Sequence, residues 1–185
     1  MTVTINVYLT LKFIMLPPDI AGHPALDLLN TYDTTNDFLR TDEDVIAWLR
    51  RKKFLGDAPV PDYAEGTLVN AAIQLREITQ AVVRSLLERS VPDVLALNRF
   101  LACGTRHLQI ICDHSGLRAE DCYDAKTPEQ LLARVGQTVA DLVIHCEPSA
   151  ILQCANEGCR LFFYNWSDSG RDRCGWSGCN SRGTV

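Results

Sequence analysis

Two cysteine pairs near the end of the chain have the residue type and the spacing of a metal site. Four residues separate the members of each pair, which are Cys154 with Cys159 and Cys174 with Cys179. Two short loops of this kind can close four thiolates around one zinc ion as a tetrahedron, because the filled d shell of zinc imposes no geometry of its own. Since protein fills all four positions, the pattern predicts one structural Zn²⁺ ion and not a catalytic one.

Composition favours metal binding over disulfide bonds. The chain has 185 residues, of which eight are cysteines, and 46% are hydrophobic, which is enough for an ordinary core without cross-links. Polar and apolar side chains alternate like those of a strand within residues 2–11, and the only early charge of residues 1–16, Lys12, lies inside the apolar run. This order differs from that of a signal peptide or a membrane helix. We therefore expect a cytoplasmic protein without a membrane partner, in a reducing compartment where thiols stay available to metal.

The remaining cysteines do not suggest a catalytic set. They stand alone in apolar or amphipathic stretches, which is typical of thiols that fill a core or its edge; they are Cys103, Cys112, Cys122 and Cys146. Cys112 and His114, expected on the same face of a strand, suggest a nucleophile and a base, but no third residue that would orient them is identifiable. We therefore do not expect an enzyme.

The elements that must position the cysteine pairs are mainly helical. Apolar residues repeat at steps of three and four through the longest expected helix, 63–88, which is the predicted centre of the core. Thr41 and Asp44 have the spacing of a capping box, and Thr127-Pro128 is the clearest helix start in the chain. A short element within 21–33 precedes these helices. The expected helices run from Thr41 to a stop at Gly56 and Pro59, over about 63–88, from Pro92 to Cys103, and from Thr127 to Glu147-Pro148.

Two hairpins are expected beside the helices. Residues 107–112 and 117–123 have a strand-like period on either side of a polar turn. Residues 151–154 and 161–166 look like short strands that bracket the first cysteine loop, and a turn at 167–170 leads toward the second. The fold class that follows is mainly α (α+β).

Three parts of the chain follow from this reading. Residues 1–16 form a strand-like N-terminal extension, residues 17–148 a helical domain with a small β-hairpin, and residues 149–185 a small zinc-binding module. This organisation places all four expected metal ligands in the last part.

Several motifs, in their order, resemble a known family. They are the phrases 26–31 (LDLLNT), 75–77 (LRE) and 159–163 (CRLFF), the last preceded by Cys154, and the closing cysteine pair. Together they resemble the bacterial family that joins an ABATE domain to a CGNR zinc finger, described as candidate stress-induced transcription regulators. The resemblance covers nearly the whole chain after the first fifteen residues. It implies a mostly helical domain that meets a ligand or partner, and a treble-like zinc module that touches DNA.

The sequence departs from the family where DNA contact is expected. The signature Cys-Gly-Asn-Arg is here 179–182 (CNSR), and an acid, Asp172, lies between two arginines. From Cys154 to Val185 there are four arginines and three acidic residues, a net charge of +1, and the whole chain carries −5. Phosphate neutralisation supplies most non-specific DNA affinity, so this electrostatic footprint is weak. The residues expected to contact nucleic acid are Arg160, Arg171, Arg173, Asn180 and Arg182.

A second group of candidate residues lies in the helical domain, namely Asp27, Asn30, Thr31 and Arg76. They could bind a ligand, or they could satisfy backbone groups locally and form a buried Arg76–Asp27 ion pair, which would be structural. The aromatic residues of the zinc module leave a similar choice between stacking on bases and covering the underside of the module, and the second is favoured. These residues are Phe162, Phe163, Tyr164 and Trp166.

Three functions therefore remain open. The first is a transcription regulator in which the helical domain senses a small molecule or protein and the zinc module engages DNA. The second is a zinc-stabilised interaction or dimerisation protein that does not bind DNA, and a homodimer is possible in either case. The third, ranked well below, is an enzyme with a pocket in the helical domain.

Overall fold

The fold is mainly α, with small antiparallel hairpins, as the sequence predicts. The computed structural model describes residues 17–33, 35–56, 59–166 and 170–180. The expected extension 1–16 and most of the expected turn at 167–170 lie outside the described residues. The elements are α1 (Pro24–Leu29), α2 (Asp42–Arg51), α3 (Thr67–Leu87), α4 (Leu95–Leu101), β1 (Arg106–Asp113), β2 (Gly116–Tyr123), α5 (Pro128–His145), the 3₁₀ turn η1 (Pro148–Ala150), β3 (Ile151–Gln153), β4 (Phe162–Tyr164) and α6 (Ser177–Asn180).

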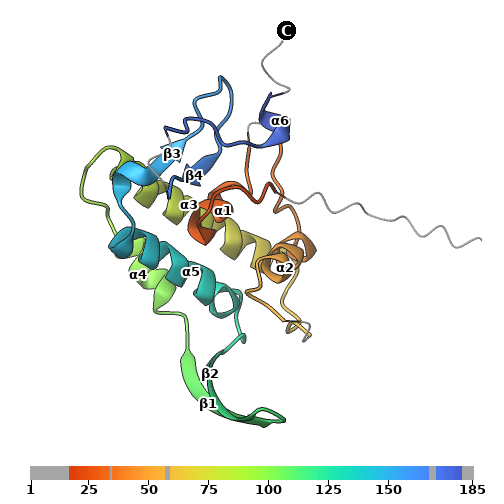
Figure 1. The fold of residues 1–185 in the computed structure, drawn as a ribbon. Coiled ribbons are helices and arrows are strands. Elements are labelled where there is room, and N and C mark those ends of the chain that lie inside the picture. The colour runs from red at the N-terminus through yellow and green to blue at the C-terminus, as the bar shows by residue number, and fades with distance from the viewer. Residues whose placement is uncertain (1–16, 34, 57–58, 167–169, 181–185) are drawn as a thin grey trace, which may run out of the picture.

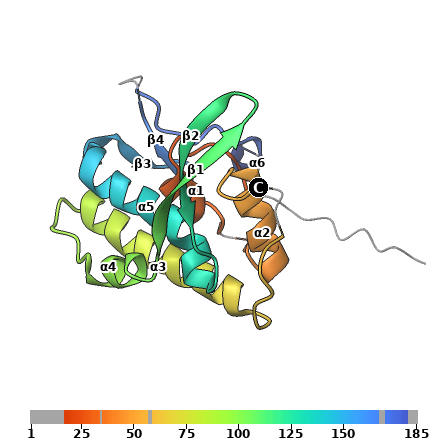
Figure 2. The same ribbon diagram turned by 90° about the horizontal axis from the view of Figure 1, so that it is seen from below.

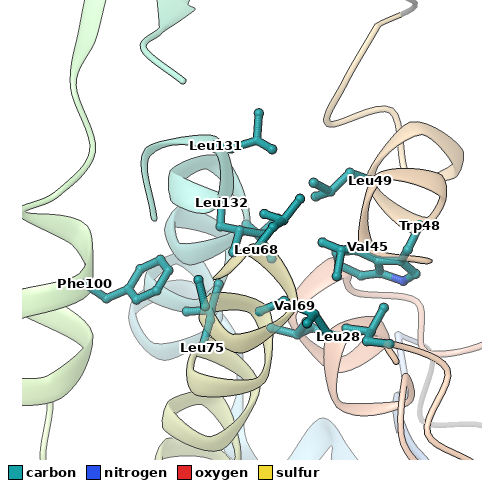
Figure 3. Close-up of a cluster of buried hydrophobic side chains, with 14 residues drawn as sticks. Leu28, Val45, Trp48, Leu49, Leu68, Val69, Leu75, Phe100, Leu131 and Leu132 are labelled. Atoms are coloured by element: carbon teal, nitrogen blue, oxygen red, sulfur yellow. The ribbon is translucent and has the colours of Figure 1, made fainter. Parts of the chain in front are cut away.

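Helices α3 and α5 form the centre of the molecule. They pack against each other, α1 and α4 pack against both, and α2 packs against α3 (Figure 1). Figure 3 shows apolar side chains from α2, α3, α4 and α5 pointing toward one another, among them Trp48, Leu75, Phe100 and Leu132. All four are at most 4% exposed. The repeat of apolar residues at helical spacing along α3 accounts for this packing, because it places them on the side that the other helices cover.

Side-chain caps fix two of the helix starts at the predicted residues. Thr41 Oγ1 accepts a hydrogen bond from the N–H of Asp44 at 3.3 Å, and Asp44 Oδ2 accepts one from the N–H of Thr41 at 3.0 Å. Thr127 Oγ1 accepts from the N–H of Gln130 at 3.3 Å, which starts α5. The predicted start of α4 at Pro92 is wrong: the helix begins at Leu95, whose N–H donates to Asp93 Oδ1 at 2.9 Å. Asp93 accepts a hydrogen bond from the first amide of the helix, so it precedes the helix instead of forming part of it.

Strands β1 and β2 form the first predicted hairpin, which projects away from the helices (Figure 1) and overlaps them in the view from below (Figure 2). One face of this ribbon is apolar and lies in solvent: Leu108, Ile110 and Leu117 are 62–77% exposed. Monomeric proteins rarely expose a large apolar surface, and such surfaces commonly mark interaction sites.

The expectation that the lone cysteines fill the core or its edge is wrong for two of them. Cys112 lies on the projecting hairpin and is exposed, and Cys103, just after α4, is exposed as well. Cys122 and Cys146 are partly buried. The expected sharing of a strand face by Cys112 and His114 is also wrong, because β1 ends at Asp113 and His114 belongs to the turn.

Strands β3 and β4 form the second hairpin, close to α1. They pair antiparallel from Ile151 opposite Tyr164 to Gln153 opposite Phe162, shorter by one to three residues than expected. The N–H of Tyr164 donates to the carbonyl of Ala21 at 2.7 Å, which joins β4 to the backbone just before α1. Ile151 is buried in the same apolar cluster as residues of α1, α3 and α5. The segment with the four clustered cysteines is therefore packed onto the helices. The described residues contain no helix that is long and apolar enough to cross a membrane.

Candidate metal centre and neighbouring groove

The four paired cysteines come from two loops that the fold brings together. Cys154 follows β3, and Cys159 closes a tight turn by donating its N–H to the carbonyl of Asn156 at 3.0 Å. Cys174 lies in the loop after β4, and Cys179 lies in the short helix α6. The N–H of Cys154 donates to Leu161 O at 2.9 Å, so the strand pairing that forms β3–β4 also holds the first cysteine loop closed.

The sulfur atoms form one compact cluster. All four Sγ atoms lie within 4.8 Å of one another, with 3.7 Å between Cys154 and Cys179 and 4.0 Å between Cys159 and Cys174. Four thiolates at about 2.3 Å from a tetrahedral zinc ion lie roughly 3.8 Å apart, so the cluster fits such an ion with small adjustments. The donor set of four cysteines suits zinc chemistry, and the four cysteines can hold one metal ion.

The surroundings of the cluster are apolar, with a few hydrogen bonds to sulfur. Cys154, Cys174 and Cys179 are at most 6% exposed, and Phe163, at 0% exposed, packs against them. Asn156 Nδ2 donates to Cys179 Sγ at 2.8 Å, and the N–H of Cys174 donates to Cys154 Sγ at 3.4 Å. Hydrogen bonds of this kind orient and stabilise thiolate ligands.

The thiols of the cluster differ in acidity. Burial raises the pKa of Cys174 to about 11 and also raises the pKa of Cys159 above its usual range. Burial acts in the same direction on Cys154, but hydrogen bonds from the backbone N–H groups of Cys174 and Asn156 outweigh it and lower the pKa of that thiol to about 7. Near neutral pH, Cys154 is therefore poised to lose its proton, while Cys159 and Cys174 keep theirs unless a cation favours their thiolates.

The described arginines among the residues expected to contact nucleic acid differ in their local contacts. Arg171 donates to the carbonyls of Arg173 and Cys174, and its guanidinium lies over the Phe163 ring at 4.8 Å from the centroid. Two of its nitrogens therefore bond to the backbone of its own loop. Arg173 is exposed beside Asp172, with 4.0 Å between the charged groups. Arg160 is exposed on the side that faces α3.

The remaining two expected contacts give less information. Asn180 is the last residue of α6. Arg182 lies outside the described residues. Contact of any of the five residues with nucleic acid stays a prediction.

The aromatic residues around the first cysteine loop mostly face inward. Phe163 lies under the cysteines, and Phe162 and Tyr164 pack against the apolar cluster of α1, α3 and α5. Trp166 is 72% exposed; its ring lies 4.6 Å from that of Tyr164, and its Nε1 donates to Gly22 O at 3.2 Å. Phe163 therefore covers the cysteine cluster as the favoured expectation has it, whereas Phe162 and Tyr164 pack toward the helices and Trp166 is exposed.

The polar group of the helical domain divides into separate contacts. The expected Arg76–Asp27 pair is wrong. Asp27 accepts from Lys52 Nζ at 2.6 Å, because its carboxylate faces the end of α2. Arg76 instead donates through both terminal nitrogens to Asp37, at 2.8 and 2.7 Å.

The other two members of that group are also hydrogen-bonded. Thr31 Oγ1 accepts from Arg76 Nη1 at 3.1 Å, and Asn30 bonds to the backbone of Phe162. Arg76 therefore pairs with Asp37 and not with Asp27, and sequence spacing does not single out Asp37 as its partner.

A groove of about 520 Å³ adjoins the cysteine cluster. It lies between α1 with the turn after it, α3, and the β3–β4 segment. The lining residues are Leu29, Tyr32, Arg76, Glu77, Gln80, Arg84, Leu87, Gln153, Arg160 and Phe162. Sequence reasoning missed most of them, although Arg76, Gln80, Arg84 and Leu87 recur at steps of four, four and three, which places them along one side of α3. That periodicity is the signal that could have found the helical wall of the groove.

Comparison with known proteins identifies the part of the chain that precedes the cysteines. A family model described as "ABATE: Putative stress-induced transcription regulator" matches residues 22–145, which run from α1 to the end of α5. A search of curated proteins found no match. The matched residues end before Cys154, so the likeness of the last segment to a CGNR finger stays a prediction. Because the model matches well over half of the sequence, the chain belongs to the ABATE family, whose description is that of a regulator and not of an enzyme.

Proposed function

We propose that this protein is a cytoplasmic transcription regulator whose last segment, 149–185, is organised by one structural zinc ion. The observation that carries the proposal is the cluster of four cysteine sulfurs within 4.8 Å of one another, attached to a member of a regulator family. Bound zinc neutralises the thiolates and links the two cysteine loops. Asn156 and the backbone of Cys174 orient the sulfurs, and Phe163 closes the underside.

In this proposal, the zinc module contacts DNA and the helical domain, 17–148, receives the signal. Arg160 and Arg173 have exposed side chains that can reach phosphates, whereas the exposed Arg171 is hydrogen-bonded to backbone carbonyls of its own loop. A single module with few arginines, on a chain of net charge −5, supports only weak and strongly salt-dependent binding. Two copies of the module on one duplex would double the number of phosphate contacts.

Metal content and DNA binding test the proposal separately. Metal analysis of the purified chain is expected to find about one zinc per chain. Binding to random-sequence duplex DNA is measured across a salt series, and Arg173→Gln is expected to reduce the slope of log affinity against log salt by about 1. Arg106→Gln, which removes the same charge from the projecting hairpin, is the matched control. Absence of DNA binding at low salt would exclude the DNA part of the proposal.

A second function is favoured by the projecting hairpin. The exposed apolar face of Leu108, Ile110 and Leu117 suits a protein partner or a second copy better than it suits DNA. In this alternative, zinc stabilises an interaction or dimerisation protein that makes no DNA contact. Sedimentation velocity over a concentration range is the test: Ile110→Thr is expected to shift a self-association equilibrium toward monomer, and Gln109→Thr, on the opposite face, is the control.

A further inference from the structure

The groove beside the cysteine cluster has the size and the lining of a small-molecule site. Its volume of about 520 Å³ lies within the usual range of ligand pockets, roughly 300–1,000 Å³. Leu29 and Phe162 contribute apolar surface at which α1 and β4 meet, and Tyr32 and Leu87 extend that surface. Polar side chains surround it, so an occupant would place an apolar portion on the floor and polar groups toward the rim.

Positive charge on the rim comes chiefly from two arginines. Arg76 also lines the groove, but Asp37 holds its guanidinium in a bidentate ion pair, and its charge lies 5.5 Å from the centroid of the Tyr32 ring. Arg84 and Arg160 form no ion pair within the part of the chain that the structure describes. Their donors are available to an anion.

We propose that this groove binds a small organic anion, with its phosphate or carboxylate group between Arg84 and Arg160 and its apolar portion against Tyr32 and Phe162. A planar guanidinium matches both kinds of anionic group by paired hydrogen bonds. The amides of Gln80 and Gln153 lie in the same lining and can bond to the polar atoms of the ligand.

The charge distribution favours a small ligand over a nucleic-acid backbone. Glu77 lies in the lining with the arginines, and Asp37 is bound to one of them. A duplex presents a row of phosphates, some of which would approach these carboxylates. A single anionic group held by Arg84 and Arg160 avoids both, and Glu77 can accept a hydrogen bond from the same ligand.

The position of the groove suggests how a bound ligand would link the helical domain to the cysteine loops. Gln153 immediately precedes Cys154, and Arg160 immediately follows Cys159, so both belong to the first cysteine loop. Arg84 belongs to α3. An anion shared by Arg84 and Arg160 therefore ties the helical domain to that loop. This coupling rests on the proposed function, whereas binding of the anion does not.

Calorimetric titration of the full zinc-loaded chain tests the proposal with three probes: inorganic phosphate, phenyl phosphate and benzoate. Saturable binding of one of the two aromatic probes at millimolar concentration or below is expected, tighter than that of inorganic phosphate because the ring covers the apolar floor. Arg84→Gln and Arg160→Gln are each expected to weaken it about tenfold, the loss of one charge-assisted contact. Arg106→Gln, on the hairpin, is expected to bind like the unchanged chain. The preferred aromatic probe identifies the anionic group.

Two results would overturn the proposal. One is the absence of any difference in probe binding between the unchanged chain and the Arg84→Gln/Arg160→Gln double variant, with both folded according to their melting curves. The other is loss of duplex DNA binding in these variants without any binding of the probes, which would assign both arginines to a DNA surface. Zinc content and DNA binding are measured on the same samples. If the chain binds the probes but no DNA, the DNA part of the proposed function is refuted and the proposed anion site in the groove stands.

Discussion

The side chain of Asn30 forms a reciprocal pair of hydrogen bonds with the backbone of Phe162. Asn30 Nδ2 donates to the carbonyl of Phe162, and the N–H of Phe162 donates to Asn30 Oδ1, both at 2.8 Å. Asn30 is fully buried at the end of α1. Its amide thus occupies the position that a neighbouring strand would have beside β4, and it satisfies both backbone groups of Phe162.

Asn30→Ala is expected to destabilise the chain by about 2 kcal/mol, because it removes both hydrogen bonds to the backbone of Phe162, at about 0.5–1.5 kcal/mol net for each. Urea unfolding of the zinc-loaded chain measures the change. Asn98→Ala, on an exposed position of α4, is the control and is expected to have little effect. Equal stability of Asn30→Ala and the unchanged chain would refute a structural role for this contact.

Lys52→Met is expected to destabilise the chain by about 3–5 kcal/mol near neutral pH, because it leaves the buried carboxylate of Asp27 without its cation. Burial raises the pKa of Asp27 even with Lys52 in place. The folded variant therefore binds a proton more readily than the unfolded chain, and its deficit should shrink as the pH falls toward 5. Unfolding curves at several pH values provide the measurement, and Lys53→Met, an exposed neighbour, is the control.

Cys154→Ser is expected to abolish stoichiometric zinc binding and to lower the melting temperature, since structural zinc contributes roughly 10–16 kcal/mol to small modules that fold around it. Metal analysis and thermal unfolding are the measurements. Cys103→Ser removes an exposed thiol outside the cluster and should retain one zinc per chain. A metal-free chain with an unchanged melting curve would contradict a structural role for the ion.

Zinc affinity is expected to fall steeply as the pH is lowered from about 8 to 6. The raised pKa values of Cys159 and Cys174 mean that both thiols carry protons in this range when no metal is bound. Binding must release at least those two protons, so affinity should change by at least about 100-fold per pH unit, and more steeply below pH 7 as Cys154 gains its proton. Competition with a chromophoric chelator at several pH values measures the slope. A pH-independent affinity would exclude this thiol chemistry.

Local sequence signals accounted for most of the helices and for the first hairpin. The capping residues Thr41 and Thr127 start α2 and α5 because their hydroxyls accept the first free amide hydrogens, a preference that needs no tertiary contact. Pro92 misled the prediction of α4, because a residue suited to the first helical turn does not outweigh the amide contact of Asp93. The exposure of Cys112 could not be predicted from the local pattern either, because an alternating strand does not reveal whether anything covers its apolar face.

Only the part of the candidate site that depends on residues close together in the sequence was predictable. The paired spacing of the cysteines indicated the sulfur cluster. The partners of Asp27 and Arg76 were not predictable, since Lys52 and Asp37 reach them only through the packing of α1, α2 and α3. The groove is formed by segments far apart in the chain, and only their association brings Arg160 toward α3.

The bonds between α1 and β4 also bear on how the chain folds during synthesis. Asn30 and Phe162 are 132 residues apart in sequence. At about 5–20 residues per second, roughly 7–26 s pass between the emergence of α1 from the ribosome and that of its partner strand. Throughout that interval the side-chain amide of Asn30 lacks its partner in the folded chain, the backbone of Phe162. During synthesis, the first cysteine loop can therefore dock onto α1 only after this interval, when the helical segments have already left the ribosome.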